Sequence, residues 1–205
     1  MATNFDLPRD KVMSPKSLAH VVLRTSNLEA MAKFYADFLG ATIVFQNDYI
    51  CFLAYDEEHH RIALIGASGT MPKVPGSCGL EHIAFTYSSI ADLALAYRQR
   101  KSRGFLPIWR VNHGPTTSIY YSDLDGNQIE TQVDNFDDMN DATIFMNSKL
   151  FDNNPIGYDF DPESLIERLQ AGESEASIKK RIEVGSRGFN DLPMANLDFY
   201  KPAGQ

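Results

Sequence analysis

The pattern of hydrophobic and polar positions occurs twice along the chain. Residues 18–32 read LAHVVLRTSNLEAMA and residues 80–94 read LEHIAFTYSSIADLA, and their apolar positions match almost one for one. Each segment opens with a short β-rich run, passes a Ser/Asn turn and continues with the apolar spacing of an amphipathic helix. Gly40 and Gly104 stand where each helix should end, as glycine does in a left-handed cap. The chain therefore contains one structural unit twice.

Three strand-like segments follow each predicted helix, and turn residues separate them. The segments are 42–46, 49–55 and 61–66 in the first copy and 106–111, 117–123 and 127–133 in the second. Each unit is therefore β-α-β-β-β and has one concave sheet face to cover. We expect an α+β fold in which two tandem βαβββ modules form a cupped, barrel-like mixed sheet around a shared site.

This repeat divides the chain into three predicted parts. Residues 1–15 form an N-terminal arm, and residues 16–134 form a catalytic domain with modules at about 16–70 and 78–134. Residues 135–205 break the repeat and are expected to form a helical and irregular C-terminal extension. We expect this extension to pack on the modules or on a second subunit, as it would in a homodimer.

The extension contains one strong helix signature, FDPESLIERLQAG. Asp161 is its expected cap, Pro162 its first residue and Gly172 its end. A second helix is predicted at roughly 174–183.

Composition narrows the classes of partner. The 205 residues are 43% hydrophobic, which is ordinary for a globular protein, and the net charge of -8 argues against nucleic acid and anionic membranes. No apolar run approaches the length of a membrane span, and the N-terminus lacks the pattern of a signal peptide. Cys51 and Cys78 are expected to be reduced thiols packed as small hydrophobes. We expect a cytoplasmic protein.

Two histidines occupy equivalent positions of the repeat. His20 and His82 are each third in the repeated segment, and pseudo-symmetry would bring both to one site. A lone histidine on an apolar strand is usually a satisfied core residue, but a pair at equivalent positions favours metal binding. Glu130, in GNQIETQ, would otherwise be a solvated edge residue, and here it completes a 2-His-1-carboxylate set. That set suits Fe(II), and zinc or manganese would fit the same ligands.

The turn before Glu130 decides which tyrosine shares its face. A three-residue connection, Leu124 to Gly126, pairs Tyr120 with Glu130, whereas a two-residue turn would pair Tyr121 with it. We favour the three-residue connection because glycine then takes the left-handed position.

The remaining histidines are His59 and His60, in the turn EEHHRIAL, and His113, in the loop VNHGPTT. Taken one at a time, each is more often an exposed residue than a functional one.

Together these residues resemble the type I extradiol ring-cleaving dioxygenases of the vicinal oxygen chelate superfamily. The stretch VNHGPTTSIYYSDLDGNQIE is close to that family's signature, which assigns the substrate-contacting tyrosine to Tyr120. The HH pair resembles the family's histidine turn, in which the second position, His60, is catalytic. Leu124 replaces the family's usual proline, and the chain has one pair of modules where many bacterial members have two.

The resemblance implies meta-cleavage of a catechol by O2 at an Fe(II) centre, as in the catabolism of aromatic compounds. His60 would then do acid–base work, while His113 and Tyr120 would position the catecholate and assist proton transfer. Mn(II) could replace iron.

Two other functions stay open at this point. One is a metal-dependent lyase, isomerase or thiol transferase of the glyoxalase kind, and the other is a small-molecule binding protein of the same fold. Neither needs His60, His113 and Tyr120 together, which favours the dioxygenase. Candidates for the pocket lining are Trp109, Phe105, Tyr49 and Phe52, each of which could equally be an ordinary core or surface aromatic.

Overall fold

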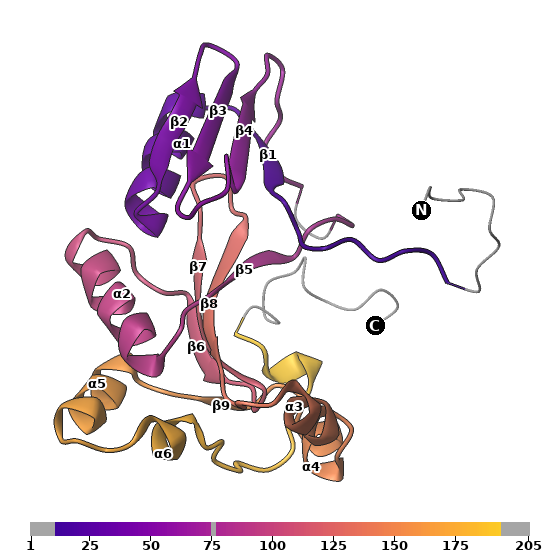
Figure 1. Ribbon diagram of the computed structural model, residues 1–205, viewed down its shortest axis with the longest axis vertical. Coiled ribbons are helices and arrows are strands. Elements are labelled where there is room, and N and C mark those ends of the chain that lie inside the picture. The colour runs from indigo at the N-terminus through magenta and orange to yellow at the C-terminus, as the bar shows by residue number, and fades with distance from the viewer. Residues whose placement is uncertain (1–10, 75–76, 194–205) are drawn as a thin grey trace, which may run out of the picture. The chain divides into compact units, whose positions relative to one another are not determined.

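The computed structural model describes residues 11–74 and 77–193, and the chain divides into two compact units. Unit 1 is Met1–Thr70 and unit 2 is Met71–Gln205. The first copy of the repeat lies in unit 1, and the second copy lies in unit 2 with the C-terminal extension (Figure 1).

Unit 1 has the predicted order β-α-β-β-β. Its elements are β1 (Val21–Thr25), α1 (Leu28–Leu39), β2 (Thr42–Gln46), β3 (Ile50–Ala54) and β4 (Ile62–Gly66). The sheet order is β1-β4-β3-β2, with β1 parallel to β4 and the other neighbours antiparallel. The crossover through α1 is what allows β1 and β4 to run in parallel.

Helix α1 begins and ends where its sequence requires. The Asn27 side chain accepts a hydrogen bond from the Ala30 N–H at 3.1 Å, and Gly40 closes the helix at φ 65°, as predicted. The helix contacts β2, β3 and β4, and its buried face packs on the sheet. The buried helix residues are Met31, Ala32, Phe34, Tyr35 and Phe38.

Unit 2 repeats this order and adds one strand. Its module comprises β5 (His82–Thr86), α2 (Ile90–Ser102), β6 (Trp109–Asn112), β7 (Thr116–Ser122) and β8 (Gln128–Asp134). The sheet order is β5-β8-β7-β6-β9, in which β5 and β8 are parallel. The added strand β9 (Tyr158–Asp159) comes from the extension and pairs with β6.

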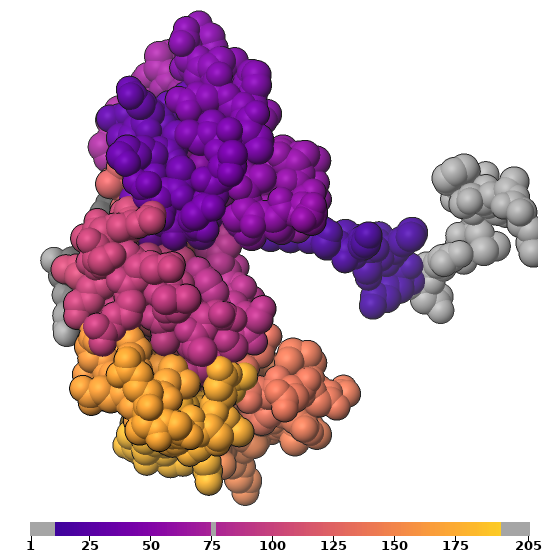
Figure 2. Space-filling view, turned by 60° about the vertical axis from the view of Figure 1, so that its left-hand side comes forward, coloured from indigo at the N-terminus to yellow at the C-terminus, as the bar shows by residue number. Residues whose placement is uncertain are grey.

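The rest of the extension is mostly helical. It contains α3 (Met139–Met146), α4 (Lys149–Asn153), α5 (Pro162–Gln170), α6 (Glu175–Lys179) and the 3-10 helix η1 (Phe189–Asp191). Figure 2 shows the orange and yellow extension directly against the magenta second module. Side chains join the two: Tyr97 of α2 donates to Glu163 at 2.8 Å, and the Glu175 carboxylate accepts the Ile90 N–H at the start of α2 at 3.1 Å.

The predicted α+β fold with tandem βαβββ modules is confirmed, and the described strands form two open sheets. The α5 helix begins at Pro162 with Asp161 as its cap, as predicted. The helix predicted at 174–183 is shorter, because Lys180 is extended (φ -62°, ψ 120°). The prediction for the cysteines is half right, since Cys51 is buried and Cys78 is exposed. No helix in the described part of the chain is long and apolar enough to cross a membrane.

Candidate metal and catalytic site

The β7–β8 hairpin fixes which side chains share a face with Glu130. Asp123 accepts hydrogen bonds from the N–H groups of Asp125 (3.0 Å) and Asn127 (2.8 Å), and Gly126 takes φ 83°. The resulting register places Tyr120 directly opposite Glu130, which confirms the three-residue connection. Tyr121 pairs with Ile129 and points to the opposite face of the sheet.

His82 and Glu130 meet across the parallel pair β5–β8. His82 is the first residue of β5, and Glu130 lies opposite Ala84, two residues further along the same face. His82 Nε2 lies 3.0 Å from Glu130 Oε2, and Glu130 is only 5% exposed. Burying an unpaired carboxylate costs free energy, and the contact with the His82 imidazole offsets part of that cost.

The two groups shift each other's titration. The hydrogen bond to Glu130 raises the pKa of His82, although burial opposes this. Burial pushes the pKa of Glu130 up, but hydrogen bonds from His82 and Ser118 outweigh it, and the pKa is lowered. Glu130 is therefore an ionised carboxylate beside a nitrogen donor. An imidazole and a carboxylate are two of the three donors that a ferrous 2-His-1-carboxylate site uses, so these residues fit the metal.

Tyr120 and His113 continue this line of contacts. His113, in the loop between β6 and β7, lies with Nε2 3.0 Å from the Tyr120 hydroxyl and Nδ1 2.6 Å from the Ile156 carbonyl. The Tyr120 ring meets the His82 ring edge to face at 5.6 Å. Burial lowers the pKa of His113 and raises the pKa of Tyr120, so both are neutral near pH 7.

Trp109 packs against both Tyr120 and His113. Its ring stacks on Tyr120 at 5.0 Å and meets His113 edge to face at 5.3 Å. Its indole N–H donates to Asp159 of β9 at 2.8 Å. Trp109 is buried, so it acts as a support for the catalytic candidates rather than as an open pocket wall.

His20 and His60 meet in unit 1 because β1 and β4 are parallel. His20 directly precedes β1, not within it as predicted, and His60 lies in the turn before β4. Arg61 donates to the carbonyls of Leu18 and Ala19 at 3.0 Å and so ties the two segments together. The His20 and His60 rings are 4.4 Å apart.

Two neighbours of His60 orient its ring. Phe52 stacks on it at 4.5 Å and 14°, and His59 Nδ1 lies 2.6 Å from His60 Nδ1. Burial, together with His20 and His59, lowers the pKa of His60. His59 is exposed, as predicted, but its contact with His60 was missed; the adjacent HH pair was the available signal.

The six predicted site residues thus fall into two groups. His20 and His60 lie together in unit 1, and the other four lie together in unit 2: His82, His113, Tyr120 and Glu130. The predicted ligands come from both units, and within either unit the described residues contain no trio of His, Cys, Asp or Glu that could hold a metal. Of the remaining aromatic candidates, Phe105 is half-buried and Tyr49 is 68% exposed.

Comparison with known proteins identifies the family. Residues 17–131 match the Glyoxalase/Bleomycin resistance protein/Dioxygenase superfamily, and the chain belongs to it. Among solved structures, the glyoxylase/bleomycin resistance protein/dioxygenase domain from Frankia sp. EAN1pec shares the fold with a TM-score of 0.50 and 18% identity. The match covers 59% of this chain and 99% of that domain.

Two curated relatives narrow the class further. The chain is 44% identical over 160 residues to biphenyl-2,3-diol 1,2-dioxygenase 2 of Rhodococcus globerulus, covering 78% of this chain and 84% of that protein. It is 43% identical over 166 residues to biphenyl-2,3-diol 1,2-dioxygenase 3 of the same organism, covering 80% and 87%. The predicted family and type of enzyme, an extradiol dioxygenase, are therefore confirmed.

Proposed function

We propose that this enzyme cleaves a catechol ring beside its vicinal hydroxyls, with Fe(II) as its metal and O2 as the second substrate. The observation that carries the proposal is the continuous line of contacts in unit 2, from His82 through Glu130 to Tyr120 and His113. It places a buried anionic donor beside two neutral hydrogen-bonding groups. The relatives are named for biphenyl-2,3-diol, which makes an aryl-substituted catechol the first substrate to test.

In this proposal His20, His82 and Glu130 would hold the metal. Fe(II), when bound, supplies the redox chemistry that couples a catechol to O2. The buried Glu130 carboxylate would supply one negative charge toward the dication, and the two histidines would bind it as neutral donors. His82 would have to be neutral to bind a metal, so it would release the proton that it can share with Glu130.

The other three residues handle protons and orientation. Tyr120 has a hydroxyl whose pKa is raised by burial, so it stays a hydrogen-bond donor and does not compete for the metal as a phenolate. His113 is neutral and holds the Tyr120 hydroxyl through Nε2. His60, whose pKa is lowered, is available as a neutral base for a substrate hydroxyl. The predicted homodimer and cytoplasmic location stay predictions.

A panel of catechols tests the function. The chain loaded anaerobically with about one iron per polypeptide should take up O2 and form a yellow ring-opened product from biphenyl-2,3-diol or from a monocyclic catechol. The measurement combines an oxygen electrode with visible absorbance. The iron-free chain and 2-hydroxybiphenyl, which lacks the vicinal diol, are the controls. Absence of O2 uptake with every catechol, by protein that has bound its iron, would contradict the proposal.

Adjacent tyrosines provide a matched pair for the role of Tyr120. Tyr120→Phe should lower kcat by about 10- to 100-fold, because it removes the hydroxyl that contacts His113 Nε2 at 3.0 Å. Tyr121→Phe should leave kcat within about twofold, because Tyr121 faces the other side of the sheet, near Arg100. Steady-state kinetics with both variants checks this. Equal losses in the two would assign Tyr120 a structural role only.

A further inference from the structure

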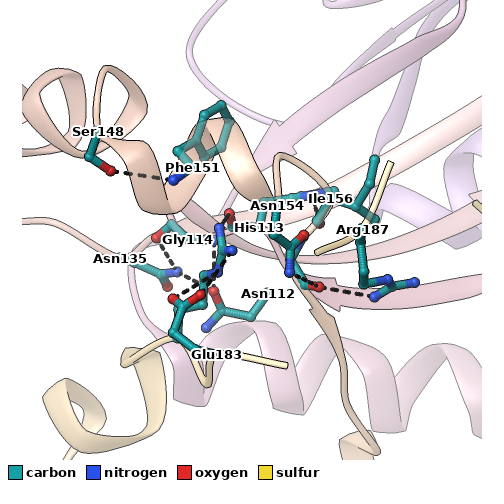
Figure 3. A network of polar contacts seen from close by, with 12 residues as sticks. Asn112, His113, Gly114, Asn135, Ser148, Phe151, Asn154, Ile156, Glu183 and Arg187 are labelled. Carbon is teal, nitrogen blue, oxygen red and sulfur yellow. Dashed lines mark hydrogen bonds and ion pairs between the residues drawn. The ribbon is translucent and has the colours of Figure 1, made fainter. Parts of the chain in front are cut away.

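The C-terminal extension, and not the module itself, supplies the second hydrogen-bond partner of His113. The Ile156 carbonyl lies 2.6 Å from His113 Nδ1, and Figure 3 shows His113 beside the segment that carries Asn154 and Ile156. We call residues 154–159 the bracket segment. It ends in β9, whose Asp159 also accepts the Trp109 indole N–H.

The chemistry of this contact decides which nitrogen of His113 carries the proton. A carbonyl oxygen only accepts, so Nδ1 must be the protonated nitrogen. In the neutral ring, Nε2 then carries a lone pair and can only accept a hydrogen bond, and the Tyr120 hydroxyl, which also has a hydrogen bond to the Glu130 carboxylate, lies 3.0 Å from it. The reverse tautomer would place a bare Nδ1 against the Ile156 oxygen and turn Nε2 into a donor.

A buried side chain and an arginine hold the bracket segment in place. Asn154 is fully buried, and its side chain accepts the Gly157 N–H at 2.7 Å and donates to the Gly157 carbonyl at 3.2 Å. Arg187 donates to the same carbonyl at 3.0 Å and pairs with Asp159 at 3.2 Å. Figure 3 shows Asn154 and Arg187 close to Ile156, with the dashed lines from these two side chains meeting at one carbonyl oxygen. The Gly157 N–H belongs to the same peptide group as the Ile156 carbonyl, so its bond to Asn154 also fixes the direction of that carbonyl.

Gly157 allows the close approach that this arrangement needs. Its φ is +99°, and an added Cβ would lie 2.0 Å from the Asn112 carbonyl oxygen and 2.7 Å from His113 Cα. Both of these are backbone atoms, which cannot move aside without shifting His113 itself. A side chain at position 157 would therefore push the bracket segment away from His113.

We propose that the bracket segment is a positioning device that fixes His113 as the Nδ1–H tautomer, so that Nε2 presents a lone pair to the Tyr120 hydroxyl. Asn154, Gly157 and Arg187 are the positioning residues. The consequence for turnover rests on the proposed ring-cleavage function; the tautomer itself does not.

Two glycines of the extension give a matched test. Gly157→Ala should disrupt the bracket, whereas Gly172→Ala places the same side chain at a similar φ of +83° with nothing within 4 Å. Asn154→Ala is a second disrupting variant, in case Gly157→Ala does not fold. Each full chain, with its histidine rings labelled with ¹⁵N and loaded with diamagnetic Zn²⁺, is examined by two-bond ¹H–¹⁵N NMR, which distinguishes Nδ1–H from Nε2–H.

The wild type and Gly172→Ala should show His113 as Nδ1–H, and the disrupting variants should show a mixture of tautomers. In the iron-loaded proteins the disrupting variants should lose about three- to tenfold in kcat, the equivalent of one hydrogen bond, with little change in KM. An Nε2–H signal from His113 in the wild type, or the same His113 tautomer in every variant, would overturn the proposal. A changed tautomer with unchanged kcat would overturn its catalytic part. A changed tautomer in a protein that cleaves no catechol would count against the proposed function alone.

Discussion

His82→Ala is expected to weaken iron binding by at least about 100-fold, because even the outer-shell partners of metal ligands contribute 10- to 100-fold. His82 provides the nitrogen donor that lies 3.0 Å from the buried Glu130 carboxylate. In the variant, Glu130 is still buried but has no imidazole beside it. Only two of the three predicted ligands, His20 and Glu130, would remain to bind the metal. Anaerobic titration with Fe(II), with metal content measured after desalting, gives the affinity and the stoichiometry. Turnover should fall with the iron content.

His59→Ala is the matched control for this measurement. His59 is a histidine of the same chain, but it is exposed and contacts His60 rather than Glu130. It should retain wild-type iron affinity. If His82→Ala binds iron as tightly as the wild type, the three-ligand assignment of His20, His82 and Glu130 is wrong, and the His82–Glu130 contact is an ordinary buried ion pair.

Local turn chemistry explains why the register of the Glu130 hairpin could be predicted from the sequence. The connection depends on Gly126, whose positive φ is as predicted, and on Asp123, which directly precedes the connection and accepts the Asn127 N–H at 2.8 Å. The period-2 geometry of strands then fixes Tyr120 on the face of Glu130 and Tyr121 on the other. The two modules were predictable for a similar reason, since a duplicated hydrophobic pattern is visible in the sequence.

The support of His113 could not be predicted in this way. Its partner is the backbone carbonyl of Ile156, 43 residues further along, and a carbonyl is present at every residue. The strand β9 that follows has only two residues, too few to show a hydrophobic period. Tertiary contacts also shorten α6: the Lys179 carbonyl accepts the Asn112 side chain at 2.9 Å. That contact occupies an oxygen that a longer helix would have used.

The division of the predicted ligands between the two units has a simpler cause. Pseudo-symmetry predicts equivalent positions for His20 and His82 in the two modules, and the structure places His20 directly before β1 and His82 as the first residue of β5. The repeat alone contains no information about how one module is oriented toward the other. Iron binding by the intact chain is therefore the measurement that links the two halves.

His60→Phe is expected to lower kcat by about 10²- to 10⁴-fold, the range for loss of a general acid–base group, while iron binding is retained. Phenylalanine keeps the planar ring that stacks on Phe52 at 4.5 Å, so the packing of the turn before β4 is preserved. The substitution removes both ring nitrogens, and with them the neutral base that burial and neighbouring histidines favour at His60. Steady-state kinetics on iron-loaded protein, with iron content measured in the same samples, separates the two effects.

A graded comparison with His59→Ala makes the result specific. His59 shares one hydrogen bond with His60, at 2.6 Å between the Nδ1 atoms, so its removal should disturb the orientation of His60 without removing the base. A neutral hydrogen bond contributes about 1 kcal/mol, and the expected loss in kcat is therefore about three- to tenfold. Wild-type kcat in His60→Phe would exclude His60 from the chemistry. If His60 is the base, kcat should fall far more in His60→Phe than in His59→Ala. Equal large losses of kcat in the two variants would instead show that the turn has a structural role.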